Sequence, residues 1–285
     1  MISIDDVTFK YKRKDDLFSH FSLNIEKGKI YGLLGKNGIG KSTLLYLMSG
    51  LLRPSDGRVI FKDKVVSRRL PETLSDIFVV PEEFDLPSIS LAQYVKVNSP
   101  FYPNFNEEQM HRYLECFDMV QDIHLGRLSM GQKKKVFMSF ALATNTSLLL
   151  MDEPTNGLDI QGKSQFRKFM ALGMTEDKTI IISTHQVHDV DKMLEHIIIL
   201  DDNRVIINQS VSNITNKVAF VAGSGKIDMA DILYTQPTVS GNSIMMRNVN
   251  GEETQLNLEL FYNALLTNKD AVSGLFNEKN ENYEK

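Results

Sequence analysis

The chain has 285 residues, a formal net charge of −4 and a single cysteine. This length suits one large α/β domain with a small additional region. The weakly negative net charge excludes a nucleic-acid-binding surface that covers the whole molecule. A single cysteine cannot form an intrachain disulfide. No apolar run approaches the roughly 18 residues of a membrane-spanning helix, and the first residues lack the basic and apolar parts of a signal peptide. We therefore expect any role at a membrane to depend on a partner.

The first predicted elements in chain order are short strands. Ile2, Ile4 and Val7 are β-type residues, and residues 21–25 and 29–34 form apolar runs of strand length. A glycine-rich loop follows the last of these runs, and apolar residues at helical spacing follow the loop. The order strand, glycine loop, helix is the arrangement in which a nucleotide-binding loop works.

Residues 35–43 carry the pattern of such a loop. They read Gly-Lys-Asn-Gly-Ile-Gly-Lys-Ser-Thr, which fits a glycine, four residues, and then Gly-Lys-Ser/Thr. Glycine lets the backbone approach an anion closely, and the N–H groups of the loop and the next helix point at it. Lys41 can reach the β- and γ-phosphates, and Ser42 can offer its hydroxyl to Mg²⁺. The predicted nucleotide-binding residues of the loop are Gly35, Asn37, Gly38, Gly40, Lys41, Ser42 and Thr43.

A helical subdomain is predicted after the strand at residues 77–80. Apolar side chains recur at helical spacing around Met110 and Tyr113, and Asn106 is a reasonable helix N-cap because two acidic residues follow it. We expect this subdomain over about residues 84–145, inserted between two strands of the core.

The core pattern then returns and ends near residue 208. Apolar runs at 147–151, 179–183 and 196–200 alternate with helical segments, which is typical of a mostly parallel sheet with helices on both faces. The predicted main domain is 1–208, and a small C-terminal accessory region covers 209–285.

The accessory region shows weaker signals. Residues 210–217 are polar and indicate a linker, and Asn250-Gly251 predicts a hairpin turn between strands at 243–249 and 254–258. The remaining predictions here are a helix at 259–268 and a disordered polar tail at 277–285.

Two acids end the apolar run at residues 147–151. At the carboxyl end of a parallel strand, such acids face the ligand crevice. Asp152 is placed to hold Mg²⁺, directly or through water, and Glu153 to orient or deprotonate the attacking water.

With these motifs the sequence resembles the ATP-binding-cassette (ABC) ATPases over about residues 1–208. Leu128-Ser129-Met130-Gly131-Gln132 is similar to the family signature Leu-Ser-Gly-Gly-Gln. Residues 156–159, which end in Asp159, resemble its D-loop, and residues 183–185 resemble the segment with its switch histidine. Tyr11 stands where the family places an aromatic residue that stacks on adenine.

The resemblance implies an ABC-type P-loop core with an N-terminal antiparallel β subdomain, an inserted helical subdomain and a small α+β C-terminal extension. It implies ATP and Mg²⁺ as ligands, with Glu153, His185 and Lys41 as catalytic residues and Ser42, Asp152 and Glu82 at the metal. Ser129, Gly131 and Gln132 would face the γ-phosphate held by a second subunit, in a head-to-tail dimer.

The sequence departs from the family at two positions. Met130 replaces the first glycine of the signature, while Ser129 and Gly131 remain. Glu82 aligns with a residue that is usually glutamine, so it adds a negative charge beside the phosphates. The run at 133–135 is three lysines, which we interpret as the solvated face of a helix rather than a nucleic-acid patch.

The leading hypothesis is the ATP-hydrolysing subunit of an ABC membrane transporter. Its expected partners are a second ATPase subunit, as a homodimer, and integral-membrane permease subunits, and it would lie in the cytoplasm on the inner face of the membrane. The C-terminal extension and Glu82 favour an exporter. The alternative is a soluble ABC ATPase that acts on ribosomes or DNA. Such proteins carry a second cassette or long coiled coils, which this chain lacks, so we expect no nucleic-acid partner.

Overall fold

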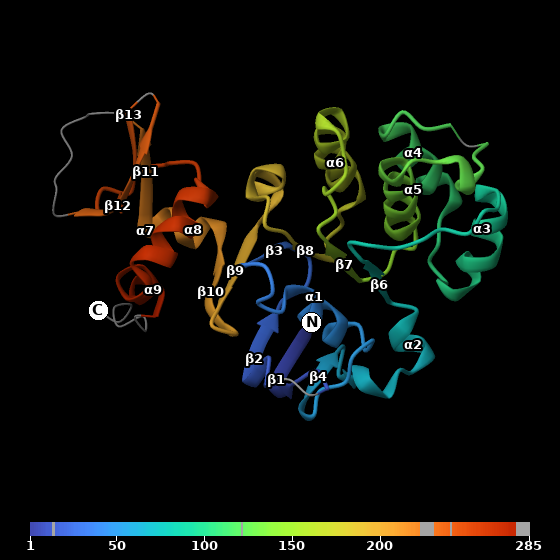
Figure 1. Cartoon of the computed structure of the whole chain (residues 1–285), viewed down its shortest axis with the longest axis horizontal. Helices are drawn as coiled ribbons and strands as arrows, with labels where there is room; N and C mark the ends of the chain where they lie inside the picture. Colours follow the sequence, from blue (N-terminus) through green and yellow to red (C-terminus); the bar gives the residue numbers. More distant parts are fainter. Residues whose placement is uncertain (13–14, 121, 223–230, 240, 278–285) are drawn as a thin grey trace.

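The computed structural model describes residues 1–12, 15–120, 122–222, 231–239 and 241–277, arranged in three sheets with surrounding helices (Figure 1). The strands are β1 (Ile2–Phe9), β2 (Phe18–Ile25), β3 (Ile30–Leu34), β4 (Asp56–Phe61), β5 (Lys64–Val65), β6 (Ile77–Val80), β7 (Leu148–Asp152), β8 (Thr179–Ser183), β9 (His196–Asp201), β10 (Arg204–Ser210), β11 (Val218–Ala222), β12 (Ile232–Thr238) and β13 (Gly241–Arg247). The α-helices are α1 (Lys41–Met48), α2 (Pro71–Leu74), α3 (Leu91–Asn98), α4 (Glu107–Cys116), α5 (Met130–Ala143), α6 (Ile160–Gly173), α7 (Val211–Lys217), α8 (Leu258–Thr267) and α9 (Lys269–Asn277).

The first sheet confirms the predicted N-terminal antiparallel subdomain. Its strand order is β2-β1-β4-β5, and every neighbouring pair is antiparallel. Helix α1 lies between this sheet and the central one, since its Leu44 and Leu47 share one apolar cluster with Val59 of β4 and Leu150 of β7. The phosphate loop at the start of α1 is therefore fixed from both sides.

The central sheet has the order β10-β9-β3-β8-β7-β6. The neighbours from β9 to β6 run parallel, and β10 returns antiparallel to β9. Strands β3, β7 and β8 are buried along their whole length, as expected for a parallel sheet covered on both faces. Because Ser183 pairs with both Leu33 and Asp152, the carboxyl ends of these three strands lie side by side.

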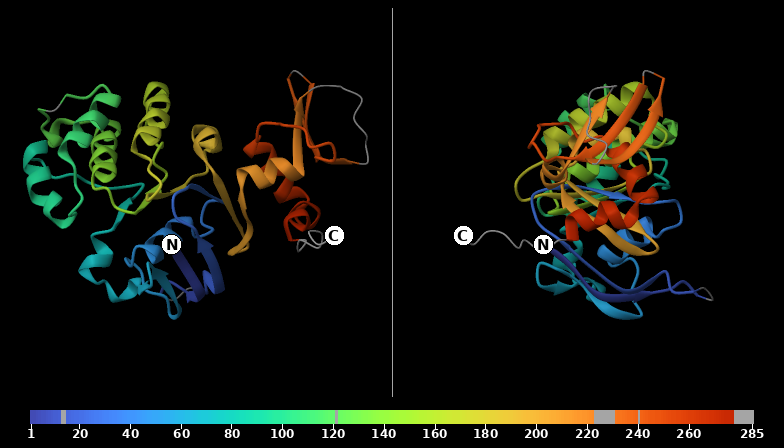
Figure 2. Two further views of the ribbon diagram at one scale, coloured as in Figure 1. Left: turned by 180° about the vertical axis from the view of Figure 1, so that it is seen from behind. Right: turned by 90° about the vertical axis from the view of Figure 1, so that its left-hand side faces the viewer.

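Helices α3, α4 and α5 form the helical subdomain at one end of the molecule (Figures 1 and 2). Asn106 is the N-cap of α4, as predicted, and its side chain accepts a hydrogen bond from the Gln109 N–H at 2.9 Å. Phe140 of α5 packs its ring against Phe105 in the subdomain and against Phe78 of β6. Helix α5 thus connects the subdomain to the central sheet.

Two predictions for the C-terminal region are wrong. Residues 210–217 are not a linker, because Ser210 caps helix α7 and Ile214 is fully buried. The predicted hairpin at Asn250-Gly251 does not form either. Strand β13 pairs instead with β11 and β12, on its two sides. The Asn248 side chain donates a hydrogen bond to the Glu252 carbonyl and accepts one from the Glu252 N–H. These bonds close a loop, and the chain continues from it to α8 without forming the predicted second strand.

The rest of the C-terminal region contains the predicted helix and one further helix that was not predicted. Helix α8 confirms the helix expected at 259–268, and α9 follows it directly. The predicted disordered tail begins at Asn277, the last residue of α9, and its other residues lie outside the described part. Within the described ranges, no helix is both long enough and apolar enough to cross a membrane.

Candidate active site

A pocket of ≈ 1070 Å³ opens where β3, β7 and β8 end. The predicted site residues that line it are Tyr11, Asn37, Gly38, Gly40, Lys41, Ser42, Thr43, Glu82, Asp152, Glu153 and His185. Asp15, Asp16, Leu17 and Asn203 also line it, and the sequence pattern did not single them out. Residues from segments far apart in the chain thus meet in one place.

The phosphate loop has the backbone that its glycines permit. Gly40 has a φ of 103°, and a side chain there would lie 2.7 Å from the Phe18 ring. Gly40 is also the N-cap of α1 and has no side chain to bond the first N–H groups of that helix. These N–H groups, unpaired within the helix, are therefore available to an anion in the pocket.

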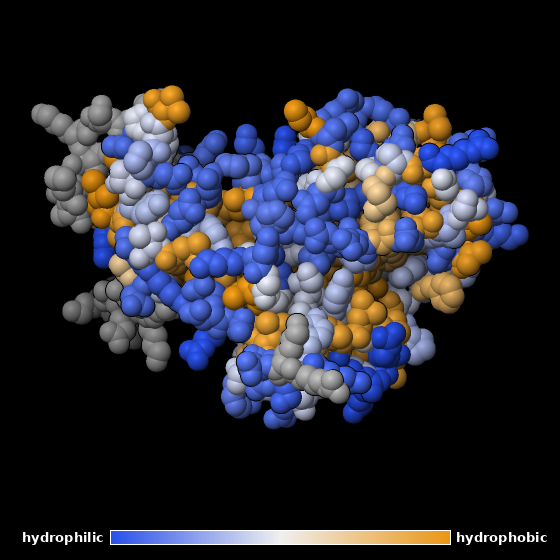
Figure 3. Space-filling model, in the orientation of Figure 1, coloured by the Kyte–Doolittle hydropathy of each residue, from blue (hydrophilic) through white to orange (hydrophobic). Residues whose placement is uncertain are grey.

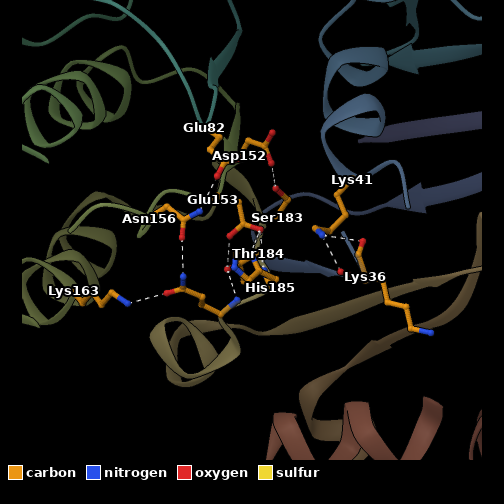
Figure 4. Close-up of polar contacts among 12 residues, drawn as sticks. Lys36, Lys41, Glu82, Asp152, Glu153, Asn156, Lys163, Ser183, Thr184 and His185 are labelled. Carbon is orange, nitrogen blue, oxygen red and sulfur yellow. Dashed lines mark hydrogen bonds and ion pairs between the residues drawn. The ribbon is translucent and has the colours of Figure 1, made fainter. Parts of the chain in front are cut away.

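Lys41 is buried at the floor of this loop. Its ammonium donates to the carbonyls of Gly35, at 2.8 Å, and Lys36, at 3.3 Å (Figure 4). Burial lowers the pKa of Lys41, while the nearby carboxylates of Glu153 and Asp152 act in the opposite direction. Gly35 does not line the pocket itself but anchors the side chain that does.

Asp152 ends β7 with its side chain in the pocket and is only 2% exposed. The Ser183 hydroxyl donates to its carboxylate. Hard oxygen ligands such as this carboxylate and the Ser42 hydroxyl are those that Mg²⁺ prefers. No cluster of three or more His, Cys, Asp or Glu side chains in the described residues could hold a metal alone.

Glu153 is held in one orientation by its backbone and its carboxylate. Its φ is 44°, unusual for a residue with a side chain, and its N–H donates to the Ser183 carbonyl at 2.9 Å. The Thr184 hydroxyl and the His185 N–H each donate to the carboxylate at 2.9 Å. The His185 ring Nδ1 lies 2.7 Å from the same carboxylate (Figure 4). The histidine therefore contacts Glu153 rather than projecting alone into the pocket.

Glu82 joins the site from the loop after β6. Its carboxylate accepts a hydrogen bond at 2.8 Å from the Asn156 side-chain amide. The oxygen of that amide accepts in turn from Gln186, also at 2.8 Å. Figure 4 shows Glu82 and Asn156 beside Asp152 and Glu153. Asn156 orders three separate segments around the pocket, and the sequence pattern had named it only as part of the D-loop.

Tyr11 reaches the pocket from the segment after β1. Its hydroxyl lies 2.9 Å from the Thr43 hydroxyl, and its ring packs edge-on against Phe9. The ring is partly exposed on the pocket wall, where an aromatic face is available to a base.

The signature residues do not reach this pocket. Ser129 is the exposed N-cap of α5, where its side chain and that of Gln132 bond each other's backbone N–H groups. Gly131 lies close to the Gly157 carbonyl, and a side chain there would approach it to 2.9 Å. Asp159 caps α6 by accepting from the Gly162 N–H. One chain thus presents the pocket and the signature at separate places.

The interpretation of the three lysines as a solvated face is wrong for Lys134. This residue is 5% exposed, and its ammonium bonds the backbone carbonyls of Glu153 and Asn156. Helical spacing carries a signal for this burial, because Met138 and Ala141 lie four and seven residues further on the same face and are also buried.

Fold and site together define a P-loop nucleoside triphosphatase. A family model described as ABC transporter matches residues 18–156. The high-affinity zinc uptake system ATP-binding protein ZnuC of Bacillus subtilis (strain 168) is 32% identical over 213 residues, which cover 70% of this chain and 91% of ZnuC. The chain therefore belongs to the ATP-binding proteins of ABC transporters, and it is an ATP hydrolase of that family.

Solved structures agree with this family. The chain is similar to cbiO1 from Clostridium perfringens, described as part of the ABC transporter complex cbiONQ, with a TM-score of 0.62 and 28% identity over 73% of this chain and 88% of that chain. It is also similar to an ATP-binding cassette solved as a dimer in a post-hydrolysis state with ADP and Pi, with a TM-score of 0.63 and 26% identity over 74% and 98% of the two chains.

Proposed function

We propose that this chain is the ATP-hydrolysing subunit of a membrane transporter, and that it works as a homodimer on a separate permease. The observation that carries the proposal is the separation, on one chain, of an ATP pocket from a signature helix start. A second copy in head-to-tail orientation supplies the missing half of each site. This arrangement is supported by the dimeric state of one similar cassette.

The residues of the pocket have distinct tasks in this proposal. The loop N–H groups and Lys41 bind the β- and γ-phosphates, and Tyr11 stacks on the adenine. Ser42 and Asp152 hold Mg²⁺, which when bound neutralises charge on the phosphate oxygens. Glu153 orients the attacking water and accepts its proton, while His185 holds the Glu153 carboxylate and reaches toward the γ-phosphate.

An apolar groove offers a surface for the permease. A cavity of ≈ 390 Å³ lies between α3, α5 and β6 and is lined in part by Phe78, Tyr94 and Phe137. Leu51 and Phe101 are both more than half exposed. Figure 3 shows apolar side chains gathered on the surface around α2 and β6. A permease segment with an apolar face would cover such a surface, since large exposed apolar patches mark interaction sites.

The location follows from the proposed partner. A chain that works through a permease lies in the cytoplasm, bound peripherally to the inner face of the membrane. Export remains our prediction for the direction, and it rests on the C-terminal extension and on Glu82. ATP-driven transport into or out of membrane vesicles that contain the complex tests it directly, since uptake in the import sense would overturn it.

The variant Glu153→Gln tests the enzyme part of the proposal. Loss of a general base lowers a rate by about 10²- to 10⁴-fold, so the kcat for ATP hydrolysis should fall by that much. ATP binding should persist, because no phosphate contact is removed. Size-exclusion chromatography with ATP should show a dimer of the variant that the wild type does not accumulate. Normal turnover by this variant would show that Glu153 has another role.

Purification of the tagged wild-type chain from its own cells tests the partner. The expected result is co-purification of an integral membrane protein in a fixed ratio after detergent extraction. The matched control is the same chain with Phe101→Ser, which should release the permease and keep ATP binding. Recovery of ribosomes or DNA instead of a membrane protein would favour the soluble alternative.

A further inference from the structure

Lys134 is a buried lysine whose contacts join two functional segments. It lies on α5, the helix that starts at the signature residue Ser129, and is 5% exposed. Its ammonium donates to the Glu153 carbonyl at 3.0 Å and to the Asn156 carbonyl at 3.0 Å. A charge that is withdrawn from water is costly unless it is well hydrogen-bonded, so these two contacts define where the side chain must stay.

The bonded carbonyls belong to the turn that positions Glu153. That turn has its first residue in a left-handed conformation, and the Glu153 carbonyl also accepts from the Asn156 N–H at 3.1 Å. Non-glycine residues persist in this conformation only when their surroundings hold them there. Lys134 is one such constraint, and it comes from a helix that belongs to the helical subdomain.

The same contacts reach Glu82. The Asn156 side chain bonds the Glu82 carboxylate, and Glu82, Glu153 and Asp152 all favour the charged form of Lys134 against the burial that lowers its pKa. The lysine thus sets a positive charge opposite the acidic residues of the site, including the glutamate that replaces the usual glutamine.

We propose that Lys134 is a positioning residue that ties the signature helix to the turn carrying Glu153, so that the position of α5 sets the orientation of the Glu153 carboxylate. This inference rests on the proposed role of Glu153. Closure of a second subunit on the signature at the start of α5 would then be transmitted through Lys134 to the group that orients the water, on the same chain.

Lys178, which lies just before β8, provides a matched control that bonds the same helix from another segment. It is 4% exposed, and its ammonium donates to the Leu142 carbonyl near the other end of α5 at 3.1 Å. Its second contact is the Asn145 side chain. The two lysines therefore share residue type and burial, and both involve α5, but only Lys134 contacts the Glu153 turn. Loss of stability alone should affect both variants in the same way.

The experiment measures the kcat for ATP hydrolysis, the Kd for ATP and the Tm of Lys134→Met, Lys134→Arg and Lys178→Met. We expect Lys134→Met to lower kcat about 10- to 100-fold, as a misplaced group does, with the Kd for ATP within twofold of the wild type. Lys134→Arg should recover part of kcat because it restores a cationic donor. Lys178→Met should lower the Tm and leave kcat unchanged. Wild-type kcat in folded Lys134→Met would overturn the proposal.

The double variant Lys134→Met with Glu153→Gln separates this inference from the proposed function. If Lys134 acts through Glu153, the double variant should be no slower than Glu153→Gln alone. Losses that multiply would show that Lys134 acts independently and would overturn the inference. If Glu153→Gln alone hydrolyses ATP normally, the assignment of Glu153 fails instead, whatever Lys134 does.

Discussion

The predicted phosphate-loop half and the predicted signature half of the ATP site lie on one chain but differ in exposure. In the first half, the side chains of Lys41, Asp152 and Glu153 are all buried and hydrogen-bonded around one pocket. In the second half, Met130 is 53% exposed and Ile160, next to the D-loop, is 91% exposed. Because these two apolar side chains are exposed in one chain, they are available to pack against a second chain.

This difference in exposure suggests why ATP hydrolysis would require two chains. A lone chain has the residues to bind ATP, since the loop, Lys41 and the acids are already arranged. In the proposed arrangement a second chain supplies the anion site on the far side of the γ-phosphate, because the signature residues of one chain do not line its own pocket. We therefore expect binding to be a property of one chain and turnover to be a property of two.

Lys41→Met should have the largest effect, because it breaks the half that one chain completes alone. Hydrogen bonds to a charged group contribute about 1.5–3 kcal/mol each, so the loss of Lys41 contacts to two phosphates should weaken ATP binding about 100-fold or more. Calorimetric titration with ATP measures this. Lys178→Met is the control for a lost buried lysine, and it should keep wild-type affinity. Equal affinity of both variants would show that Lys41 does not contact the phosphates.

Ser129→Arg should disable the signature half and leave the phosphate-loop half intact. A long cationic side chain at the exposed N-cap should obstruct the partner while the pocket stays unchanged, so the Kd for ATP should hold and kcat should fall about 100-fold. The control is Ser90→Arg, which removes the same kind of capping box from α3 at a similar cost of about 1 kcal/mol in stability. A loss of turnover in both variants would indicate a folding defect.

A mixture of Lys41→Met and Ser129→Arg chains sharpens the comparison further. Neither variant alone has a complete site, but a mixed dimer pairs the intact loop of one chain with the intact signature of the other. With random pairing, about a quarter of wild-type sites should be restored. ATP turnover is measured before and after mixing at fixed total protein. No gain on mixing would argue that both halves act within one chain.

The phosphate-loop half could be predicted from the sequence because its chemistry is local. The glycines, Lys41 and Ser42 stand within nine consecutive residues, and each is required by the backbone or the ligand at that place. The strands at 77–80 and 179–183 were also predicted with the bounds that the structure shows, since both are continuous apolar runs.

The contacts that cross the fold could not be predicted in this way. Lys134 stands in a run of three lysines, and its helical spacing to Met138 and Ala141 indicates its burial. Its bonds to the Glu153 and Asn156 carbonyls depend on how α5 packs against a turn that is distant in sequence. The C-terminal hairpin failed for a similar reason. The Asn-Gly signal at 250–251 is local, whereas β13 pairs with β11 on one side and with β12 on the other. Strand β12 contains Pro237 and has little buried apolar surface, so its sequence gives only a weak signal for this pairing. Tertiary pairing overrode the turn signal.

Tyr11→Ala should weaken ATP binding by about tenfold, since stacking between a base and an aromatic ring contributes about 1–3 kcal/mol. Tyr11→Phe keeps the ring but removes the hydroxyl that contacts Thr43, so its Kd should stay within twofold of the wild type. GTP gives a second readout, because a ring without base-specific contacts would accept it as well. If Tyr11→Phe weakens binding as much as Tyr11→Ala, the hydroxyl matters and stacking does not.

Glu82→Gln should have the smallest effect, and it should strengthen the binding of ATP to the phosphate-loop half. The carboxylate lines the pocket and is solvent-exposed, so its repulsion of the phosphates is worth about 0.5 kcal/mol, or roughly a twofold lower Kd in the variant. Glutamine can still accept the Asn156 hydrogen bond, so the backbone should not move. The gain should shrink as salt is raised from 0.05 M to 0.5 M, because screening weakens it. Glu83→Gln, which changes the neighbouring exposed acid outside the pocket, is the control. If Glu82→Gln instead raises the Kd for ATP or the Mg²⁺ concentration needed for binding, Glu82 contributes to the metal site within the phosphate-loop half, as the sequence predicted.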